Sequence, residues 1–237
     1  PMTSQPPALI LAAGRGERMR PLTDRTPKPL LPVRGKPLIV WHLEALAAAG
    51  VREVVINTAW LEDQFPAALG DGARWGLRIR YSTEGRDHGG ALETAGGIAT
   101  ALPLLQCDTF WVLGGDVYMP GWHFDPAAVT DFTSCGDLGH LWLVPNPPQH
   151  PGGDFGLSAE GRVLAADDPA VKTRYTYSTV ALFNAGVVAG VRPGEKAKLR
   201  PHLDAAIAHG RLGGSLYTGA WADVGTPQRW EAWQTEG

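Results

Sequence analysis

Residues 8–23 read ALILAAGRGERMRPLT, and this stretch decides which fold the chain adopts. Its opening residues are apolar and end at Gly14, which is typical of a buried strand in a parallel sheet. From Gly14 to Arg34 the chain holds Gly, Pro, Thr and basic residues with no hydrophobic period. Because long loops inside a compact domain are usually functional, the stretch predicts a strand that ends in a functional loop.

Strands and helices alternate along the chain after this loop. Apolar runs predict strands at 51–57, 77–82 and 109–113, and segments bounded by proline or glycine predict helices at 38–49, 61–69 and 92–105. The alternation predicts an α/β protein with a three-layer Rossmann-like fold and a mostly parallel mixed sheet. In such sheets, ligands bind at the carboxyl ends of the strands.

The second half of the chain is less regular. Its patterns predict strands at 140–144, 163–165 and 176–183, and helices at 199–209 and 227–234. No repeat or linker interrupts the chain, so we expect a single domain over residues 1–237. Residues 1–7 are polar and rich in proline, and Pro1 precedes Met2, so we expect a disordered or tag-derived N-terminus.

The composition excludes several classes of protein. The chain has 237 residues, 44% of them hydrophobic, and a net charge of −3, which leaves no basic footprint for nucleic acid. No apolar run approaches the roughly 20 residues that a membrane span needs. Cys107 and Cys135 form neither a disulfide framework nor a metal-binding spacing, so we expect a protein of the cytoplasm.

The glycines of the opening stretch indicate a site for phosphate. Gly14 and Gly16 allow backbone amides to approach an anion closely, and Arg15 and Arg18 add charge that suits phosphate oxygens. The chain lacks the Gly-Lys-Ser/Thr of a P-loop, and a dinucleotide fingerprint would need Gly or Ala where Met19 stands. The loop is therefore of another phosphate-binding kind.

Residues 8–23 resemble the signature loop of the sugar-phosphate nucleotidyltransferase family. The runs TPKPLLPV at 26–33 and GKPLI at 35–39 are similar to the family's second signature and its continuation. Gly115-Asp116 and WADVGTP at 221–227 extend the resemblance over nearly the whole chain. It implies an enzyme that joins a sugar 1-phosphate to a nucleoside triphosphate and releases pyrophosphate, with residues 8–116 binding the nucleotide and 117–237 the sugar.

Such a reaction needs little covalent help from the protein. Two anions must be brought together and the developing charge must be stabilised, so positioned cations carry the catalysis. The resemblance implies that Arg18 and Lys28 contact the phosphates and that Asp116 and Asp223 bind a metal ion, which we expect to be Mg²⁺. Lys28 lies between two prolines that stiffen its backbone.

The resemblance also implies the residues around the two substrates. Those expected at the nucleotide are Leu11, Ala12, Ala13, Gly14, Arg15, Gly16 and Glu84, and those expected at the sugar phosphate are Asn57, Glu93, Thr94, Gly96 and Asp154. Glu84 is the candidate to read the base edge, because a carboxylate accepts the N–H groups of uracil or guanine. A surface acid is an equal alternative. Residues 85–90 are polar and glycine-rich, and we interpret them as a flexible insert.

Within the family, the resemblance favours UTP and N-acetylmuramic acid 1-phosphate, which would place the enzyme in cell-wall recycling. Three departures from that pattern are Gly115, where Asn is expected, Thr179, where Gly is expected, and the insert after Glu84. Lys172 and Arg174 could pair with the lactyl carboxylate or be plain surface charges. The alternatives are a heptose or mannose 1-phosphate guanylyltransferase, or a sugar-nucleotide binding protein without catalysis, which would be expected to have lost its lysine or aspartates.

Overall fold

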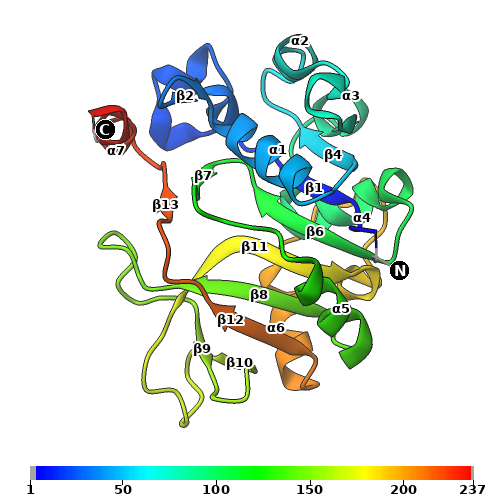
Figure 1. Ribbon diagram of the computed structural model, residues 1–237, viewed down its shortest axis with the longest axis vertical. Coiled ribbons are helices and arrows are strands. Elements are labelled where there is room, and N and C mark those ends of the chain that lie inside the picture. The colour runs from blue at the N-terminus through cyan, green and yellow to red at the C-terminus, as the bar shows by residue number, and fades with distance from the viewer. Residues whose placement is uncertain (1–3, 236–237) are drawn as a thin grey trace.

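The computed structural model describes residues 4–235, which fold around one seven-stranded sheet (Figure 1). The strands lie in the order β12-β8-β11-β6-β1-β4-β5. Their bounds are β1 Ala8–Leu11, β4 Glu53–Thr58, β5 Arg78–Thr83, β6 Thr109–Gly114, β8 Gly139–Val144, β11 Thr176–Asn184 and β12 Leu212–Leu216. Only β11 runs antiparallel to its neighbours in this sheet. The predicted mixed, mostly parallel sheet is confirmed.

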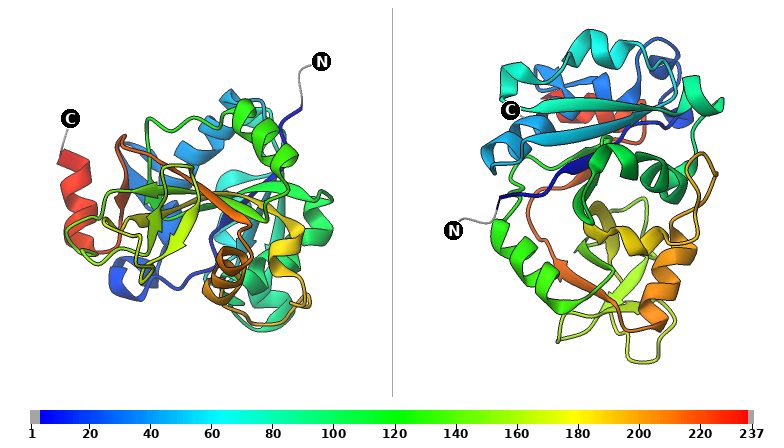
Figure 2. Two further views of the ribbon diagram at one scale, coloured as in Figure 1. Left: turned by 90° about the horizontal axis from the view of Figure 1, so that it is seen from below. Right: turned by 90° about the vertical axis from the view of Figure 1, so that its right-hand side faces the viewer.

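Helices cover both faces of the sheet and make the three layers (Figure 2). The helices are α1 Leu38–Ala48, α2 Gln64–Leu69, α3 Glu84–His88, α4 Glu93–Leu105, α5 Pro126–Cys135, α6 Arg200–Ala208 and α7 Pro227–Thr235. The side chains of β1 explain the arrangement, since neighbouring residues of a strand point to opposite faces. Ile10 packs in the core with α1, α2 and α5, whereas Leu9 packs in the core with α4 and α6.

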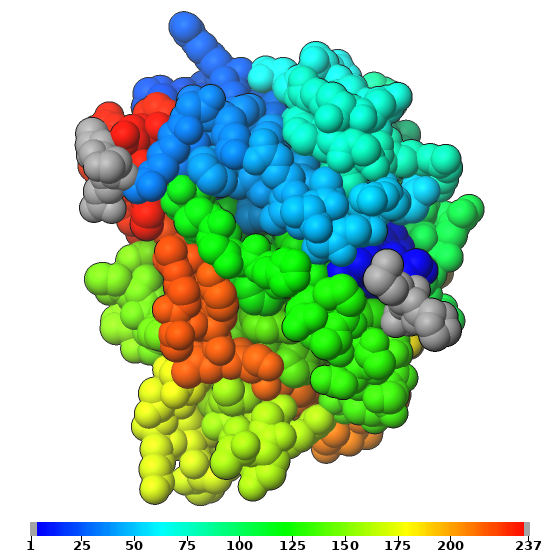
Figure 3. All heavy atoms as spheres, in the orientation of Figure 1, coloured from blue at the N-terminus to red at the C-terminus, as the bar shows by residue number. Residues whose placement is uncertain are grey.

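Short two-stranded ladders connect the loops at the ends of the sheet. They are β2 Pro32–Val33 with β3 Lys36–Pro37, β7 Val117–Tyr118 with β13 Ala222–Asp223, and β9 Phe155–Leu157 with β10 Val163–Ala165. A third core of Met19, Leu31, Val33 and Tyr118 has Trp230 of α7 packed against it. The space-filling view shows this C-terminal segment, in red, against the blue N-terminal third of the chain (Figure 3).

Several parts of the chain differ from the sequence-based predictions, and three of them concern longer elements. Residues 85–90 are no flexible insert, because most of them form α3, and a Cβ on Gly85 would lie 2.7 Å from the Ala59 carbonyl oxygen. Helix α5 was not predicted, although Asp125 caps it by accepting the Ala127 amide at 2.9 Å and proline follows Asp125. Strand β12 was also not predicted, since Gly213 and Gly214 give it a weak strand pattern.

The expectation of a disordered N-terminus is wrong for residues 4–7, and residues 1–3 lie outside the described part. The Gln5 side chain accepts the Trp111 indole N–H at 3.0 Å and donates to the Phe124 carbonyl at 2.9 Å. The Pro7 carbonyl accepts the Trp111 amide at 3.0 Å. These bonds attach the segment to the sheet. Within residues 4–235, no helix is both long and apolar enough to span a bilayer.

Candidate active site

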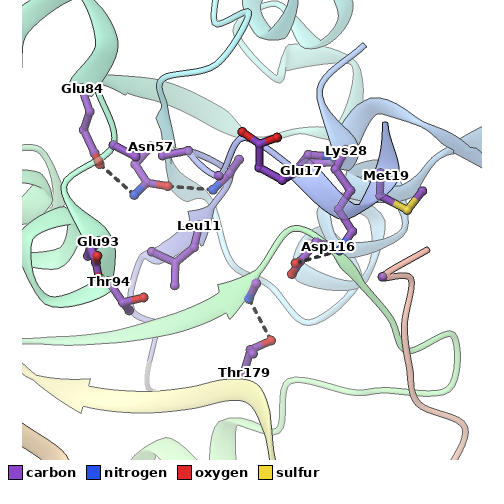
Figure 4. Close-up of a pocket in the computed structure, with 18 of the residues that line it drawn as sticks. Leu11, Glu17, Met19, Lys28, Asn57, Glu84, Glu93, Thr94, Asp116 and Thr179 are labelled. Carbon is purple, nitrogen blue, oxygen red and sulfur yellow. Dashed lines mark hydrogen bonds and ion pairs between the residues drawn. The ribbon is translucent and has the colours of Figure 1, made fainter. Parts of the chain in front are cut away.

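A pocket of about 620 Å³ lies at the carboxyl ends of the central strands (Figure 4). Leu11 ends β1, Gly114 ends β6, and Asn57 lies one residue before the end of β4. The predicted site residues that line it are Leu11, Ala12, Ala13, Gly14, Gly16, Arg18, Lys28, Asn57, Glu84, Glu93, Thr94 and Asp116. The edge of the sheet at which a ligand site was expected therefore contains a cavity.

Lys28 joins Asp116 and Asp223, the two aspartates that are expected to bind a metal ion. Its ammonium lies 3.2 Å from Asp116 Oδ2 and 3.5 Å from Asp223 Oδ1. The lysine is 8% exposed and begins a tight 3₁₀ turn, Lys28–Leu30, which points the long side chain inward. Asp116 remains the more open of the two acids, with 44% of its side chain exposed, against 28% for Asp223. The site thus sets a buried cation between two partly open carboxylates.

The β7–β13 ladder brings these acids together. Asp223 pairs with Val117, the residue after Asp116, so two distant parts of the chain meet at one point. On its other side Asp223 has the Arg229 guanidinium at 3.9 Å. His42 of α1 contacts the β7 strand of this ladder, with its Nε2 2.7 Å from the Val117 carbonyl oxygen. Burial lowers the pKa of His42 to about 4, so the ring is neutral at neutral pH and Nε2–H donates.

A hydrogen-bond chain crosses the nucleotide side of the pocket. Asn57 accepts the Ala12 amide at 2.7 Å and donates to Glu84 Oε2 at 2.8 Å, while Glu84 Oε1 accepts the Leu92 amide at 2.9 Å. Gly97 leaves room for the amide, since a Cβ there would lie 2.6 Å from Asn57 Nδ2. Burial raises the pKa of the Glu84 carboxyl, against the opposing effect of its two hydrogen bonds.

Glu84 is therefore an internal carboxylate and not a surface acid. Its residue is 0% exposed, and each of its oxygens already accepts one hydrogen bond. The structure places it where it ties the loop after β1 to the start of α4. Contact with a base edge stays a prediction for this residue.

Arg15 and Arg18, two of the three arginines in residues 14–20, face different surroundings. Arg15 does not line the pocket, because it forms an ion pair with Asp24 at 2.6 Å and stacks over the Trp60 ring at 3.9 Å. Arg18 does line it and is exposed. It has no ion pair within residues 4–235. Contact between Arg18 and a phosphate stays a prediction that its place in the pocket lining allows.

Three other predicted residues also lie outside the pocket lining. Gly96 donates its amide to the Ala197 carbonyl at 3.0 Å and packs against that loop. Asp154 lies 2.9 Å from His150 Nε2 and accepts the Tyr177 amide at 2.8 Å. Asp223 reaches the site through Lys28. Lys172 and Arg174 do not line the pocket either.

Several lining residues were not predicted from the sequence. They are Glu17, Met19, Pro29, Ala91, Gly114, Thr179, Lys196 and Gly225. Thr179 carried a signal, since it stands where the family pattern has glycine. Lys196 carried none, because its place depends on a loop that the Ala197 amide fastens to the Leu92 carbonyl at 3.0 Å.

Comparison with known proteins defines the class to which this fold and site belong. A family model described as "Nucleotidyl transferase" matches residues 7–235, and the chain belongs to that family of enzymes. The chain is 48% identical over 226 residues to N-acetylmuramate alpha-1-phosphate uridylyltransferase of Neisseria meningitidis serogroup B, covering 92% of this chain and 93% of that protein.

More distant relatives have the same fold or sequence pattern. Mannose-1-phosphate guanylyltransferase of Mycobacterium tuberculosis is 34% identical over 235 residues, which are 95% of this chain and 63% of that protein. HddC from Yersinia pseudotuberculosis, solved with GMP-PN, superposes with a TM-score of 0.75 at 18% identity over 96% of this chain and 97% of that one. The second likeness is one of fold.

Proposed function

We propose that the protein transfers a nucleotidyl group to a sugar 1-phosphate, with UTP and N-acetylmuramic acid 1-phosphate as the preferred pair. The chemistry is carried by one observation, the Lys28 ammonium held between Asp116 and Asp223 beside a glycine-rich loop. The choice of substrates is supported by the 48% identity with the Neisseria uridylyltransferase. Because the reaction draws on nucleoside triphosphates, we place it in the cytoplasm.

In the proposed reaction, an oxygen of the sugar phosphate attacks the α-phosphorus of the nucleoside triphosphate. A P–O bond forms as the bond from the α-phosphorus to the oxygen bridging to the β-phosphorus breaks. The electron pair of that bond leaves with pyrophosphate, so the step needs no oxidant or reductant. Since both reactants are anions, the protein contributes alignment and positive charge.

The glycine loop and its neighbours suit the triphosphate. Gly16 has a φ of +68°, and the space beside Gly14 is open, so the loop amides can approach phosphate oxygens. Arg18 adds a guanidinium without a competing ion pair. Lys28 lies deeper, where its charge would act on the reacting phosphates as negative charge rearranges.

The two aspartates fit a divalent cation. Both carboxylates lie within 3.5 Å of the same ammonium, so their oxygens face a common point that already favours positive charge. Carboxylate oxygens are hard ligands, which suits Mg²⁺. Residues 4–235 contain no cluster of three or more acidic, His or Cys ligands, so substrate phosphates and water would complete the coordination. When bound, such an ion would neutralise phosphate charge; the protein supplies Asp116 and Asp223 to hold it.

A guanylyltransferase acting on mannose 1-phosphate is the second candidate. It is supported by the 34% identity with the Mycobacterium guanylyltransferase. Guanine and uracil both present N–H donors, so hydrogen bonding to an acceptor does not separate them and the width of the base pocket must do so.

A pyrophosphate-release assay tests both candidates. The purified protein is given UTP, GTP, dTTP or CTP, each with the 1-phosphates of N-acetylmuramic acid, glucosamine, mannose and a heptose. We expect the highest kcat/KM for UTP with N-acetylmuramic acid 1-phosphate, and background release by Lys28→Ala. Faster turnover of GTP with the mannose or heptose phosphate would support the second candidate instead. If none of the substrate pairs gives pyrophosphate release, the proposed reaction is overturned.

A further inference from the structure

Thr179 has a backbone conformation that is unusual for its side chain. Its φ is +71°, in the left-handed region that favours glycine. Among residues 4–235, the other non-glycine residues with positive φ are Arg34, Leu61, Glu93 and Gln106, so Thr179 is the single β-branched one. A strained conformation of this kind persists only where surrounding contacts impose it, and it often marks a functional position.

The contacts that impose it come from a bulge in β11. The pairing of β11 with β8 shifts between Tyr177 and Ala181, so the regular ladder is interrupted around Thr179. There the Thr179 hydroxyl, and not a backbone carbonyl, accepts the Gly114 amide at 3.3 Å. The bulge also turns the Ser178 carbonyl to accept the Trp221 indole N–H at 3.1 Å.

The Thr179 hydroxyl and the Asp116 carboxylate converge above Gly114. A Cβ on Gly114 would lie 2.6 Å from Thr179 Oγ1 and 2.9 Å from Asp116 Oδ1, so both oxygens crowd the same side of that glycine. Both residues line the pocket, and Figure 4 shows the Thr179 hydroxyl bonded to the end of β6. A polar side chain is thus fixed beside the carboxylate assigned to metal binding.

The hydroxyl has one hydrogen left to donate. Its oxygen accepts the Gly114 amide, and no acceptor for its O–H lies among the hydrogen bonds of residues 4–235. A hydroxyl both donates and accepts, whereas phosphate and carbonyl oxygens only accept. Hence the pocket presents a hydroxyl donor that no acceptor of the described residues uses, on the same wall as Asp116.

We infer that the Thr179 hydroxyl donates its hydrogen bond to an acceptor oxygen of the sugar 1-phosphate and sets the affinity for that substrate. The inference rests on the proposed function, since it assigns a residue to one of the two substrates. It accounts for a threonine at a position whose φ favours glycine, because glycine would relieve the backbone but remove the donor.

Three substitutions at this position separate binding from folding. Thr179→Val keeps the branched shape and loses the hydroxyl, Thr179→Ser keeps the hydroxyl, and Thr179→Gly suits the φ and loses the hydroxyl. We expect Val and Gly to lower kcat/KM for the sugar 1-phosphate roughly 10-fold or more, the scale of a lost hydrogen bond to a charged group. We expect KM for the nucleotide to change less than about 2-fold and the Ser variant to stay near wild type.

The thermal midpoint separates a loss of stability from a loss of affinity for the sugar 1-phosphate. We expect Thr179→Gly to be at least as stable as Thr179→Val, since glycine accepts the positive φ, while both lose sugar-phosphate affinity. Affinity is also measured directly by calorimetry with the sugar 1-phosphate and a non-hydrolysable nucleotide. Thr133→Val, on the exposed face of α5, is the matched control and should match wild type.

Two results would overturn the inference. One is a Thr179→Gly variant with wild-type kcat/KM for the sugar 1-phosphate, and the other is a Thr179→Val variant whose KM rises equally for both substrates. If instead the wild-type protein turns over no sugar 1-phosphate at all, the proposed function itself has failed, which is a distinguishable outcome.

Discussion

Asn57 donates a hydrogen bond of 2.8 Å to Glu84, and this single contact links the ends of two neighbouring parallel strands. Because Asn57 also accepts the Ala12 amide at 2.7 Å, the chain of bonds crosses the carboxyl edges of β1, β4 and β5. The side chains of Asn57 and Glu84 therefore connect the strands at the edge of the sheet, where the backbone hydrogen bonds end. A buried carboxylate in that position makes this connection sensitive to pH.

Replacing the Glu84 carboxylate should change how stability depends on pH. Burial raises the folded-state pKa of the Glu84 carboxyl, so the folded protein binds a proton at Glu84 more tightly than the unfolded chain does. The contribution of Glu84 is thus most favourable below its unfolded pKa and declines as pH rises through the folded value. We measure the difference in thermal midpoint between wild type and Glu84→Gln, taken as wild type minus variant. We expect this difference to become smaller as the pH rises from about 4.5 to about 8. A difference that grows with pH would contradict this sign.

Loss of the Lys28 charge should slow turnover more than it weakens nucleotide binding. The ammonium faces both aspartates and, in the proposed reaction, the rearranging phosphates. We expect Lys28→Ala to lower kcat by roughly 10²-fold or more, the scale for one preorganised charge contact. Steady-state kinetics and a nucleotide titration check this, with Lys198→Ala, an exposed lysine outside the pocket lining, as the control. An unchanged kcat would remove Lys28 from the chemistry.

Arg15 and Arg18 should respond in different ways to removal. Arg15 is committed to Asp24 and Trp60, whereas Arg18 lines the pocket without an ion pair in the described chain. We expect Arg18→Ala to raise KM for the nucleoside triphosphate about 10-fold, the scale of a lost charge-assisted bond. Arg15→Ala should mainly lower the thermal midpoint. The reverse pattern would show that Arg15 moves to the phosphates on binding.

Removing one carboxylate of the pair should weaken metal dependence. We expect Asp223→Asn to need a higher Mg²⁺ concentration for half-maximal activity, because a neutral amide attracts a divalent cation less than a carboxylate does. Mn²⁺ binding measured by magnetic resonance gives a readout apart from turnover. Asp204→Asn, an exposed aspartate of α6, is the control. Pyrophosphate release that persists after chelation would exclude a required metal.

His42 should make the fold sensitive to mild acid. Burial lowers its folded-state pKa to about 4, while the unfolded value is 6.5, so its contribution is present above the unfolded value and is lost as pH falls between the two. At about pH 5 the loss would be about 2 kcal/mol. We expect His42→Gln, which keeps an N–H donor, to show a smaller drop in thermal midpoint between about pH 7.5 and about pH 5. Equal drops would refute the assignment.

The sequence predicted the site best where function requires a fixed order of residues. The glycine loop, Lys28 and Asp116 are read from contiguous motifs, and the structure brings them together around one pocket. Arg15 does not line the pocket, because its partners Asp24 and Trp60 are fixed by tertiary packing that no local pattern reveals, and its contact with the nucleotide stays a prediction.

Weak local patterns explain the remaining differences. Strand β12 is rich in glycine, and its place depends on pairing with β8. The hydroxyl bond of Thr179 depends on a bulge, which the alternation of apolar residues does not encode. Such features belong to the packed fold and not to the segment that carries them.

The pairing of β13 with β7 has a consequence for how the enzyme is made. Asp223 pairs with Val117, and Trp230 of α7 donates to the Pro32 carbonyl at 2.8 Å, so late residues complete structures begun much earlier. During synthesis the glycine loop and its strands emerge long before these partners do. Contacts so distant in sequence form late in folding. A ribosome-bound chain that stops before Ala222 would thus carry the nucleotide loop but lack Asp223, and we expect it to release no pyrophosphate.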